Sequence, residues 1–503
     1  METFWQNNSC NPFGDRSTPC EVGNMISYAV NVSAAAEIAA TIHFARTHNV
    51  RFVVRNTGHD FNGRSTGAGG LAVWTHHLKS LEIIQNIEMK GDPDKGEQSY
   101  QGPALKMGSG VQGVEAEHFA ADAGLVVVGG WCPSVGIAGG FTQGGGHSPL
   151  GSQFGMGADQ TLEFQVVTAN GSVVTASPQE NSDLYWALSG GGPGTYGIVT
   201  SVTVRAYPNM PVGGAFVSIT NDLSLPNAST VLENYWATIQ TWHTLLPNLT
   251  STGIGATFSY NNSLFYLIPL TAYNKTSKDV RAALKPWIDQ MDTLGVNYSA
   301  SFTDFPSYYS HWTTFALPGP VGAYWQGTSR LVPTDIFDDP TSLEKFIGVQ
   351  RKLADQGVYA GATAVAPRKL TGFANAVLPA WRNTVSLFGL LTDWSDDPTR
   401  WEEMQEMQHY VDQELRPLLK SVTGGTAGDG NWARGSYLNE ASGDDPAWKQ
   451  EFFGENLQRL EEVKQRWDPD GLFWGLRLVG SEAREIRGQP TGIGNGRLCK
   501  AEK

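Results

Sequence analysis

The chain has 503 residues, more than one ordinary domain, so we expect two or three structural units. Its 35 basic and 49 acidic residues give a net charge of −14 at pH 7, which argues against binding to nucleic acid or anionic lipid, because both need clustered Lys and Arg. With 17% charged and 11% aromatic residues, the composition indicates a folded chain rather than a disordered one.

The N-terminal segment points to an oxidising compartment. Cys10 and Cys20 bracket a short stretch rich in Pro, Gly and Asp, which predicts a local disulfide, with two unpaired thiols as the alternative. Glycosylation sequons occur at Asn7, Asn31, Asn170, Asn227, Asn248, Asn261, Asn274 and Asn297. The chain begins METFWQNNSC, so either a signal peptide has been removed or none existed. The disulfide and the sequons favour removal, and we expect a secreted, extracellular protein.

Short strands and helices alternate with glycine-rich loops at first. Ser33 is expected to cap a helix from Ala34 to about His48, and strands are expected at 51–55 and 71–75. The later expected elements are strands at 104–110, 125–128 and 197–208, helices at 114–124 and 182–188, and a hairpin with its turn at Asn170-Gly171.

The composition changes after Pro208. Residues 209–430 contain less glycine and most of the sequons, and they mix strands with long amphipathic helices. The expected elements are strands at 256–260, 263–270 and 385–391, and helices at Val231–Leu246, Thr399–Lys420 and, in the last part, Trp448–Trp467. Asp468-Pro469-Asp470-Gly471 then provides a helix stop signal.

Glycine is concentrated in three loops. Of the 58 glycines, 22 lie in 58–70, 124–157 and 190–197. The stretch from Ala123 to Ala158 has no Asp, Glu, Lys or Arg and is long enough to span a bilayer, but its glycines would make a poor membrane helix, so we expect no membrane segment. Glycine-rich turns let backbone N–H groups approach a ligand, which predicts a site for something flat, anionic or both.

Three familiar motifs are present only in part. Gly58 to Ser65 nearly fits a P-loop and Gly63 to Gly67 fits a nucleophile elbow, but both lead into a strand where those motifs need a helix. Gly192 to Gly197 fits G-x-G-x-x-G with a helix before it and a strand after it, the reverse of a dinucleotide fold. Zinc motifs are missing, so we expect no metal site.

Longer segments resemble a known family. RNTGHDFNGRSTGAGGLAVWT, from Arg55, resembles the pyrophosphate loop of the VAO/PCMH flavoproteins, the family of vanillyl-alcohol oxidase and p-cresol methylhydroxylase. GGWCPSVGIAGGFTQGGGHSPLG, YLNEAS and WKQEFFGENLQRLEEVKQRWDPDGLFW resemble its berberine-bridge-enzyme-like branch, and especially the fungal members called isoamyl-alcohol-oxidase-like. The resemblance implies an α+β fold. It divides the chain into a PCMH-type FAD-binding domain at 1–208, a substrate-binding domain at 209–430 with a helix-covered antiparallel sheet, and a C-terminal module at 431–503 that returns to the FAD domain.

The same resemblance implies bicovalent FAD, bonded at its 8α-methyl to His59 and at C6 to Cys132. The other residues matched to the cofactor site are Arg55, Asn56, Thr57, Gly58, Asp60, Gly63, Arg64, Ser65, Val135, Gly136, Gly139, Gly140, Gly144, His147, Gly197, Val199 and Asn439. For Arg64, a solvated side chain at the loop edge is the alternative. Val135 falls at the family's oxygen gate, where a small side chain implies access for O2, with an ordinary packing valine as the alternative.

Tyr437 matches a tyrosine of the family's closing pattern and is the candidate for deprotonating a substrate hydroxyl, with a purely structural role as the alternative. Glu440 could share that role or lie on the surface. Phe61 departs from the tyrosine that many relatives have at this position, which removes a hydroxyl that could orient a substrate. The aromatic stretches Tyr308-Tyr309, His311-Trp312 and Tyr324-Trp325 suit stacking on a sugar or aromatic ring, with packing in the core as the alternative.

The implied activity is that of an oxidase. Hydride passes from a hydroxyl-bearing carbon of an alcohol, carbohydrate or phenolic metabolite to flavin N5, and O2 then becomes H2O2. The alternatives are an FAD-dependent dehydrogenase or oxidative cyclase of secondary metabolism, and a binding glycoprotein on a flavin fold that has lost its activity. We expect a monomer whose partners are a small-molecule substrate and O2.

Overall fold

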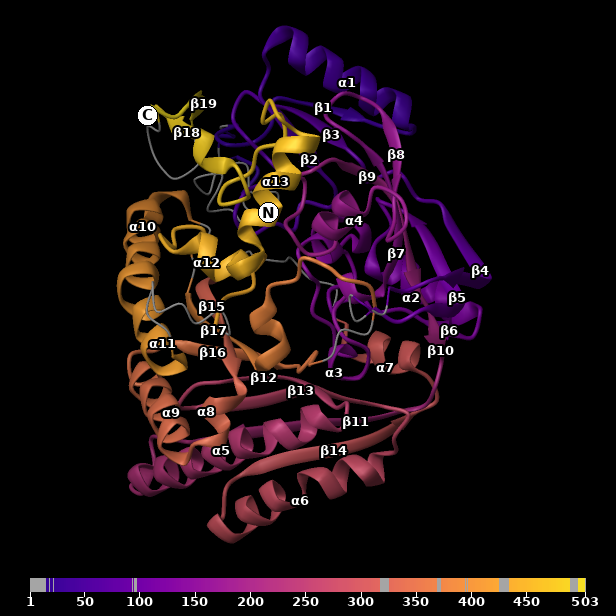
Figure 1. Cartoon of the computed structure of the whole chain (residues 1–503). Helices are drawn as coiled ribbons and strands as arrows, with labels where there is room; N and C mark the ends of the chain where they lie inside the picture. The colour runs from indigo at the N-terminus through magenta and orange to yellow at the C-terminus, as the bar shows by residue number, and fades with distance from the viewer. Residues whose placement is uncertain are drawn as a thin grey trace.

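The computed structural model describes residues 15–17, 19–20, 22–92, 94, 97–316, 325–368, 372–393, 395, 397–424, 434–488 and 496–502. Two sheet-containing units make up most of the molecule, and the C-terminal residues, in yellow, lie beside the first of them (Figure 1).

The first unit combines a small parallel sheet, in the order β1-β3-β2, with a five-stranded antiparallel sheet in the order β4-β5-β9-β7-β8. Its elements are β1 (Tyr28–Asn31), α1 (Ala35–His48), β2 (Phe52–Arg55), β3 (Leu71–Trp74), β4 (Leu81–Met89), β5 (Tyr100–Gly108), α2 (Gly113–Asp122), β6 (Leu125–Val126), α3 (Gly151–Phe154), β7 (Thr161–Val167), β8 (Val173–Ala176), α4 (Ser182–Leu188), β9 (Ile198–Arg205) and β10 (Tyr207–Pro208).

Local sequence signals account for most of this unit. Helix α4 has the predicted bounds, and the hairpin turn places Gly171 at φ +85°, where glycine is favoured. The predicted cap of α1 is wrong. The N-cap is Ala34, and the carboxylate of Glu37 accepts from the N–H groups of Ser33, at 2.6 Å, and Ala34, at 3.3 Å. Because the Ser33 hydroxyl also bonds to that carboxylate, it is not free to cap the helix.

The second unit is built on one antiparallel sheet of seven strands, in the order β14-β11-β13-β12-β16-β17-β15. Its elements are β11 (Val212–Thr220), α5 (Ala228–Ser251), β12 (Gly255–Tyr260), β13 (Leu264–Tyr273), α6 (Ser277–Leu294), β14 (Tyr298–Phe305), α7 (Tyr308–Phe315), β15 (Trp325–Pro333), α8 (Thr334–Asp338), α9 (Pro340–Ala354), β16 (Tyr359–Ala364), η5 (Pro379–Asn383), β17 (Thr384–Asp393), α10 (Trp401–Tyr410), η7 (Val411–Leu415) and α11 (Arg416–Thr423). Helices α5 and α6 lie on the side of the sheet away from the first unit (Figure 1).

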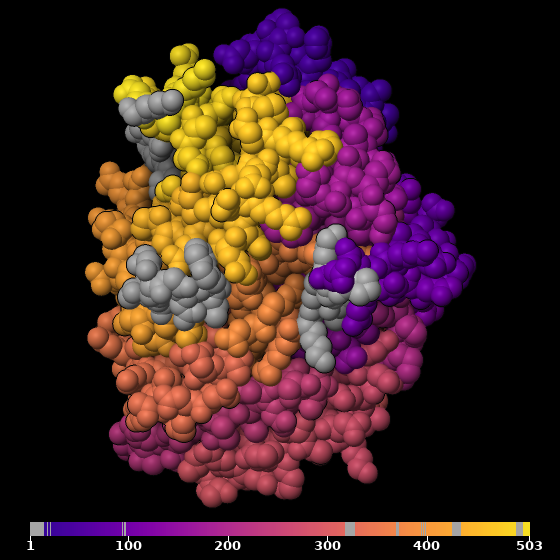
Figure 2. Space-filling model, viewed as in Figure 1, coloured from indigo at the N-terminus to yellow at the C-terminus, as the bar shows by residue number. Residues whose placement is uncertain are grey.

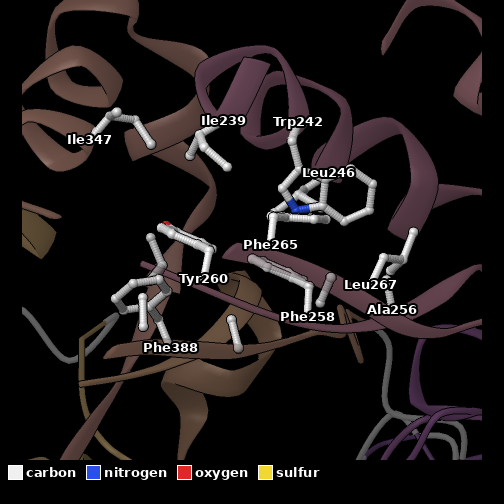
Figure 3. Packing of buried hydrophobic residues seen from close by; sticks show 14 of the residues in the cluster. Ile239, Trp242, Leu246, Ala256, Phe258, Tyr260, Phe265, Leu267, Ile347 and Phe388 are labelled. Carbon is white, nitrogen blue, oxygen red and sulfur yellow. The ribbon is translucent and has the colours of Figure 1, made fainter. Parts of the chain in front are cut away.

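An aromatic core joins α5 to the sheet. Figure 3 shows Trp242 and Leu246 of α5 above Phe258, Tyr260 and Phe265 of the strands, and all five side chains are buried. Burying a large apolar side chain contributes about 1.5–3 kcal/mol, so this cluster is a main source of stability for the unit.

The opposite face of the sheet is also buried. Successive side chains of a strand point to opposite faces, and in β17 Phe388 joins the helix-side core whereas Leu387 packs with Trp381 and Tyr437. The second face therefore packs against residues near the C-terminal module.

Two predicted helices are interrupted. The helix expected at Thr399–Lys420 is α10, a π-helical turn (η7) and α11, because Pro417 lacks the N–H that would continue the ladder. The helix expected at Trp448–Trp467 is α12 (Trp448–Phe453) and α13 (Leu457–Trp467), separated at Gly454, whose φ of +54° is not helical.

The C-terminal residues pack on the first unit. Leu438, Phe453 and Leu460 share a core with Leu162 and Tyr196, and Figure 2 shows the yellow segment lying against magenta atoms of the first unit. A terminal hairpin of β18 (Arg484–Arg487) and β19 (Arg497–Lys500) completes the described chain.

The α+β fold class is confirmed. Cys10 lies outside the described residues, so its pairing with Cys20 stays a prediction, and Cys132 and Cys499 are free thiols. Within the described ranges, helices long and apolar enough to cross a membrane are absent. The same ranges hold no group of three or more His, Cys, Asp or Glu that could bind a metal ion.

Candidate active site

The glycine-rich loops and the C-terminal module meet around one cavity. The predicted residues in its wall are Asn56, Thr57, Gly58, His59, Asp60, Arg64, Ser65, Cys132, Val135, Gly136, Gly139, Gly140, His147, Gly197, Val199, Tyr437 and Asn439. Arg55, Gly63 and Gly144 do not line it. Arg55 instead supports the first loop, because its Nη1 donates to the carbonyl of Ser65 at 3.2 Å.

Glycine at two of these positions permits close contacts. A Cβ on Gly144 would lie 2.3 Å from the amide nitrogen of Asn439, and one on Gly136 would lie 2.6 Å from Oδ1 of Asn56. With glycine at 144, Asn439 Nδ2 can donate to the carbonyl of Gly140 at 2.9 Å and to the Tyr437 hydroxyl at 2.8 Å. The second loop is thereby joined to the C-terminal module.

His59 and Cys132 come from different loops and contact the same side chain. His59 Nε2 lies 2.9 Å from Ser134 Oγ, and Cys132 Sγ lies 3.6 Å from that oxygen. Burial lowers the pKa of His59 to about 4, so its imidazole is neutral at pH 7. With Nε2 held by Ser134, Nδ1 is the ring nitrogen left for a ligand. The wall thus presents two side chains that can form bonds with carbon.

Several wall atoms are buried and have no hydrogen-bond partner in the described part of the chain. They are Asn56 Oδ1, Arg64 Nη2, Ser65 Oγ, Ser109 Oγ, Trp131 Nε1 and Asn439 Oδ1. A buried polar group without a partner costs about 1–3 kcal/mol, so a ligand rich in phosphate, hydroxyl and carbonyl groups would be favoured here. FAD has these groups, and the residues present fit it.

Arg64 is buried, with 4% of its side chain exposed, so the alternative of a solvated arginine is wrong. Its Nε donates to the carbonyl of Leu476 at 2.9 Å and its Nη1 to that of Leu438 at 3.1 Å. Asp60 accepts from the backbone N–H of Arg64 at 2.8 Å. Arg64 therefore connects the first loop to the C-terminal module, and its Nη2 amino group is left without a hydrogen-bond partner among the described residues.

Tyr437 lies in the wall, as predicted for the candidate base, and 3% of it is exposed. Burial and the negative charge of Glu440 raise the pKa of its phenol, against the opposing hydrogen bond from Asn439. The phenol is therefore neutral at physiological pH, which weighs against a role in taking up a proton.

A second titratable group stands beside this tyrosine. His147 Nε2 lies 2.8 Å from Oε1 of Glu440, and both residues line the cavity. The imidazole meets the edge of the Tyr437 ring at 5.2 Å between centroids and stacks on Trp381 at 6.2 Å. The site thus contains a histidine paired with a carboxylate.

The second unit contributes none of the described wall residues. Stacking of Tyr308, His311 and Trp312 on a substrate is wrong, because they are at most 1% exposed and pack in the core, where Trp312 Nε1 donates to the carbonyl of Gly130 at 3.0 Å. Tyr324 lies outside the described residues. Further wall residues were not singled out from the sequence: Trp131, Gln143, Phe473 and Trp474 lie inside the segments that carry the family resemblance, and Ser109 lies outside them.

Three glycine-rich loops, two bond-forming side chains and unpaired polar atoms around one cavity define a binding site for a flavin dinucleotide. Comparisons with known proteins also indicate an FAD-binding protein. A family model described as FAD binding domain matches residues 26–177, and one described as Berberine and berberine like matches residues 436–475.

Relatives match over nearly the whole chain. FAD-linked oxidoreductase ZEB1 of Gibberella zeae is 39% identical over 507 residues, which is 100% of this chain and 83% of the relative. VAO-type flavoprotein oxidase VAO615 of Thermothelomyces thermophilus is 40% identical over 508 residues, 99% and 82% of the two chains. Bifunctional decalin synthase calF of Penicillium decumbens is 37% identical over 512 residues, 99% and 83%.

A solved structure has the same fold. The crystal structure of the VAO-type flavoprotein MtVAO615 from Myceliophthora thermophila C1 matches with a TM-score of 0.87 and 37% identity, over 99% of this chain and 86% of the other. The chain therefore belongs to the VAO-type FAD-linked oxidoreductases, in the berberine-bridge-like branch, and is an FAD-dependent oxidoreductase. The predicted PCMH-type fold is confirmed.

Proposed function

We propose that this protein is a secreted flavoprotein oxidase that holds FAD through covalent bonds to both His59 and Cys132. The contact of both side chains with Ser134 is the observation that supports this most directly, since it brings two nucleophiles from separate loops to one part of the cavity wall. The neutral imidazole of His59 keeps a lone pair for bond formation. The disulfide and sequons expected from the sequence support secretion.

The substrate is a small molecule with a hydroxyl-bearing carbon, such as an alcohol, a carbohydrate or a phenolic metabolite. Bound FAD would supply the hydride acceptor and pass the two electrons to O2, so that the carbinol group becomes a carbonyl group and O2 becomes H2O2. Wall residues with unpaired donors, among them Ser65 and Ser109, would bind the polar groups of the cofactor. Val135 presents a small side chain where O2 would enter, and the protein acts as a monomer.

Colour retained after denaturation tests the covalent bonds. The purified protein should be yellow, and the yellow should stay with the chain after precipitation with trichloroacetic acid. Each bond replaces one hydrogen of the flavin and one of the side chain, with the two electrons going to O2. After deglycosylation, the intact mass should therefore equal the chain with its Cys10–Cys20 disulfide plus FAD, minus four hydrogens for the two bonds. In His59→Ala or Cys132→Ala, the single remaining bond should remove only two hydrogens.

Cys499→Ser is the matched control, because this second free thiol is outside the cavity wall and its loss should leave both bonds in place. A colourless protein would contradict the flavin enzyme, and both bonds surviving in His59→Ala or Cys132→Ala would contradict the chosen attachment residue.

A dehydrogenase or an oxidative cyclase is the second candidate, and the relative named as a bifunctional decalin synthase favours it. A panel of primary alcohols, oligosaccharides and phenolic metabolites should identify a substrate that bleaches the flavin without oxygen. Release of H2O2 in air, one for each substrate oxidised, would support the oxidase. Turnover only with an artificial acceptor would support the dehydrogenase.

A further inference from the structure

The cavity wall contains one histidine with a carboxylate partner. His147 Nε2 and Glu440 Oε1 are 2.8 Å apart, although 293 residues separate them in the chain. When the imidazole is neutral, the carboxylate favours the tautomer with the proton on Nε2. Nδ1 then has a free lone pair, and it makes no hydrogen bond with any residue that the structure describes.

The ring of His147 is held from several sides. The indole of Trp381, on η5, stacks on it with an angle of 20° between the planes, and Tyr437 meets it edge-on at 81°. The main chain of Glu440 is held in turn, because its backbone carbonyl accepts from the hydroxyl of Ser329 at 3.1 Å. A proton acceptor fixed in this way needs little reorganisation during a reaction.

The charged and titratable surroundings of the pair are simple. Tyr437 and Asn439 face it from the C-terminal module, and η5 contributes Trp381. The next residue of η5, Arg382, turns away and pairs with Asp159 at 2.7 Å. Within the described ranges, the Glu440 carboxylate is the only ionic partner of His147.

We propose that His147 is the catalytic base that takes the proton of the substrate hydroxyl, and that Glu440 is a positioning residue that fixes its tautomer and stabilises its charged form. Tyr437, whose hydroxyl accepts from Asn439, orients the substrate hydroxyl by donating to its oxygen. This assignment rests on the proposed function and replaces the tyrosine as the proton acceptor. Its direct basis is the paired imidazole in the wall beside a buried phenol.

The proton and electron balance is complete. The substrate O–H bond breaks and an N–H bond forms at His147 Nδ1, while the C–H electron pair leaves with its hydrogen for the cofactor and the C=O bond forms. The imidazolium, stabilised by Glu440, then releases its proton toward the H2O2 that forms from O2. A histidine paired with a carboxylate performs the same exchange in other enzymes.

Two measurements test the proposal on the flavin-containing protein. Anaerobic stopped-flow bleaching, with the best substrate from the panel, should slow about 100-fold or more in His147→Gln, because positioned acid–base groups contribute about 10²–10⁴-fold. Glu440→Gln should slow bleaching about tenfold, as loss of an orienting partner does. In Tyr437→Phe, the rate of bleaching should fall about tenfold or less.

The second measurement does not need a substrate. In protein labelled with 15N-histidine, the signals that vanish in His147→Gln should show that the neutral form of the ring carries its proton on Nε2. Glu440→Gln should remove that tautomer preference, which a merely structural contact would not do. His118→Gln is the matched control, since His118 is exposed and lies 3.8 Å from the carboxylate of Asp122.

Bleaching of His147→Gln within about threefold of the unsubstituted rate would overturn the proposal and leave the oxidase intact. A ring protonated on Nδ1 would also overturn it, because that atom could not accept a proton. If no substrate on the panel bleaches the unsubstituted protein, the proposed substrate class is wrong. The tautomer measurement then still decides whether Glu440 fixes the tautomer of His147.

Discussion

The side chain of Ser134 relates the two proposed attachment residues to each other. Its hydroxyl contacts His59 Nε2 and Cys132 Sγ, so it fixes which ring nitrogen of His59 faces the cavity. A histidine with two equivalent free nitrogens would form the flavin bond from either one, or from neither in a productive orientation.

Ser134→Ala should therefore reduce attachment at His59 and leave attachment at Cys132 in place. After deglycosylation, the intact mass should show a new species equal to the chain plus FAD minus two hydrogens, and peptide mapping should find its adduct on Cys132. Ser224→Ala, an exposed serine, is the control. If every molecule of Ser134→Ala has the mass of the chain plus FAD minus four hydrogens, both bonds have formed and Ser134 does not orient the ring.

Gly144 makes the contact between the second loop and Asn439 possible. A methyl group there would lie 2.3 Å from the Asn439 amide, so Gly144→Ala should displace Asn439 and destabilise the protein by about 1–3 kcal/mol. The thermal unfolding temperature and the flavin absorbance per chain should both fall. Gly348→Ala is the control, because a Cβ there meets nothing within 4 Å, and it should leave both values unchanged or slightly raise the unfolding temperature.

Wall residues within a contiguous motif, such as His59 and Cys132, were predicted through the family resemblance of their segments, and glycine density marked the loops that contain them. It did not predict the His147–Glu440 pair or the contact with Trp381. Those contacts depend on how segments hundreds of residues apart are packed, and no local pattern records them. Arg64 was ambiguous for the same reason, since only the C-terminal module buries it.

At the scale of elements, short helices and strands bounded by glycine or proline were predictable, as α4 shows. Long amphipathic helices were predicted as continuous, because apolar periodicity survives a local break. Pro417 and Gly454 cause those breaks, and both residue types are standard interruptions. In the second unit, β15 pairs with β17, although other elements separate the two strands in the chain. The alignment of their residues depends on tertiary packing.

Helix α13 is attached to the first unit through a buried lysine, whose ammonium group also pairs with Asp468 within the C-terminal module. Lys464 Nζ donates to Asp468 at 2.6 Å, to the carbonyl of Thr195 at 2.8 Å and to that of Phe473 at 2.6 Å. Burial lowers the pKa of this ammonium group, which the charge of Asp468 opposes. The contact with Thr195 reaches the third glycine-rich loop, so this lysine connects the C-terminal module to the cavity wall.

Lys464→Met should leave Asp468 buried without its cation and lower the free energy of unfolding by about 3–5 kcal/mol. Urea titration followed by tryptophan fluorescence would measure the loss. Lys449→Met is the matched control, because Lys449 pairs with Glu482 on the surface, where both side chains are more than a third exposed, and such pairs contribute about 0–1 kcal/mol. Equal losses in the two variants would contradict a special role for Lys464.

For the whole molecule, buried histidines contribute to the response to acid. Burial lowers the pKa of His243 to about 3 and those of His59 and His311 to about 4. His243 lies in the aromatic core of the second unit, with Nε2 at 2.9 Å from the Tyr260 hydroxyl. None of these rings takes up a proton in the folded protein at pH 5, although the unfolded chain does so below about pH 6.5.

The sign of the effect follows from proton uptake. Between pH 6.5 and about 3 the unfolded state binds more protons at His243 than the folded state, so stability is full above pH 6.5 and falls as the pH decreases. From pH 7 to pH 5 this group alone should lower the free energy of unfolding by about 2 kcal/mol.

His243→Gln should be less stable than the unsubstituted protein at pH 7. On going to pH 5, however, its free energy of unfolding should fall by about 2 kcal/mol less than that of the unsubstituted protein. Urea titrations at both pH values measure the two losses, with exposed His118→Gln as the control. Parallel losses in the unsubstituted protein and His243→Gln would show that this histidine is not the acid-sensitive group.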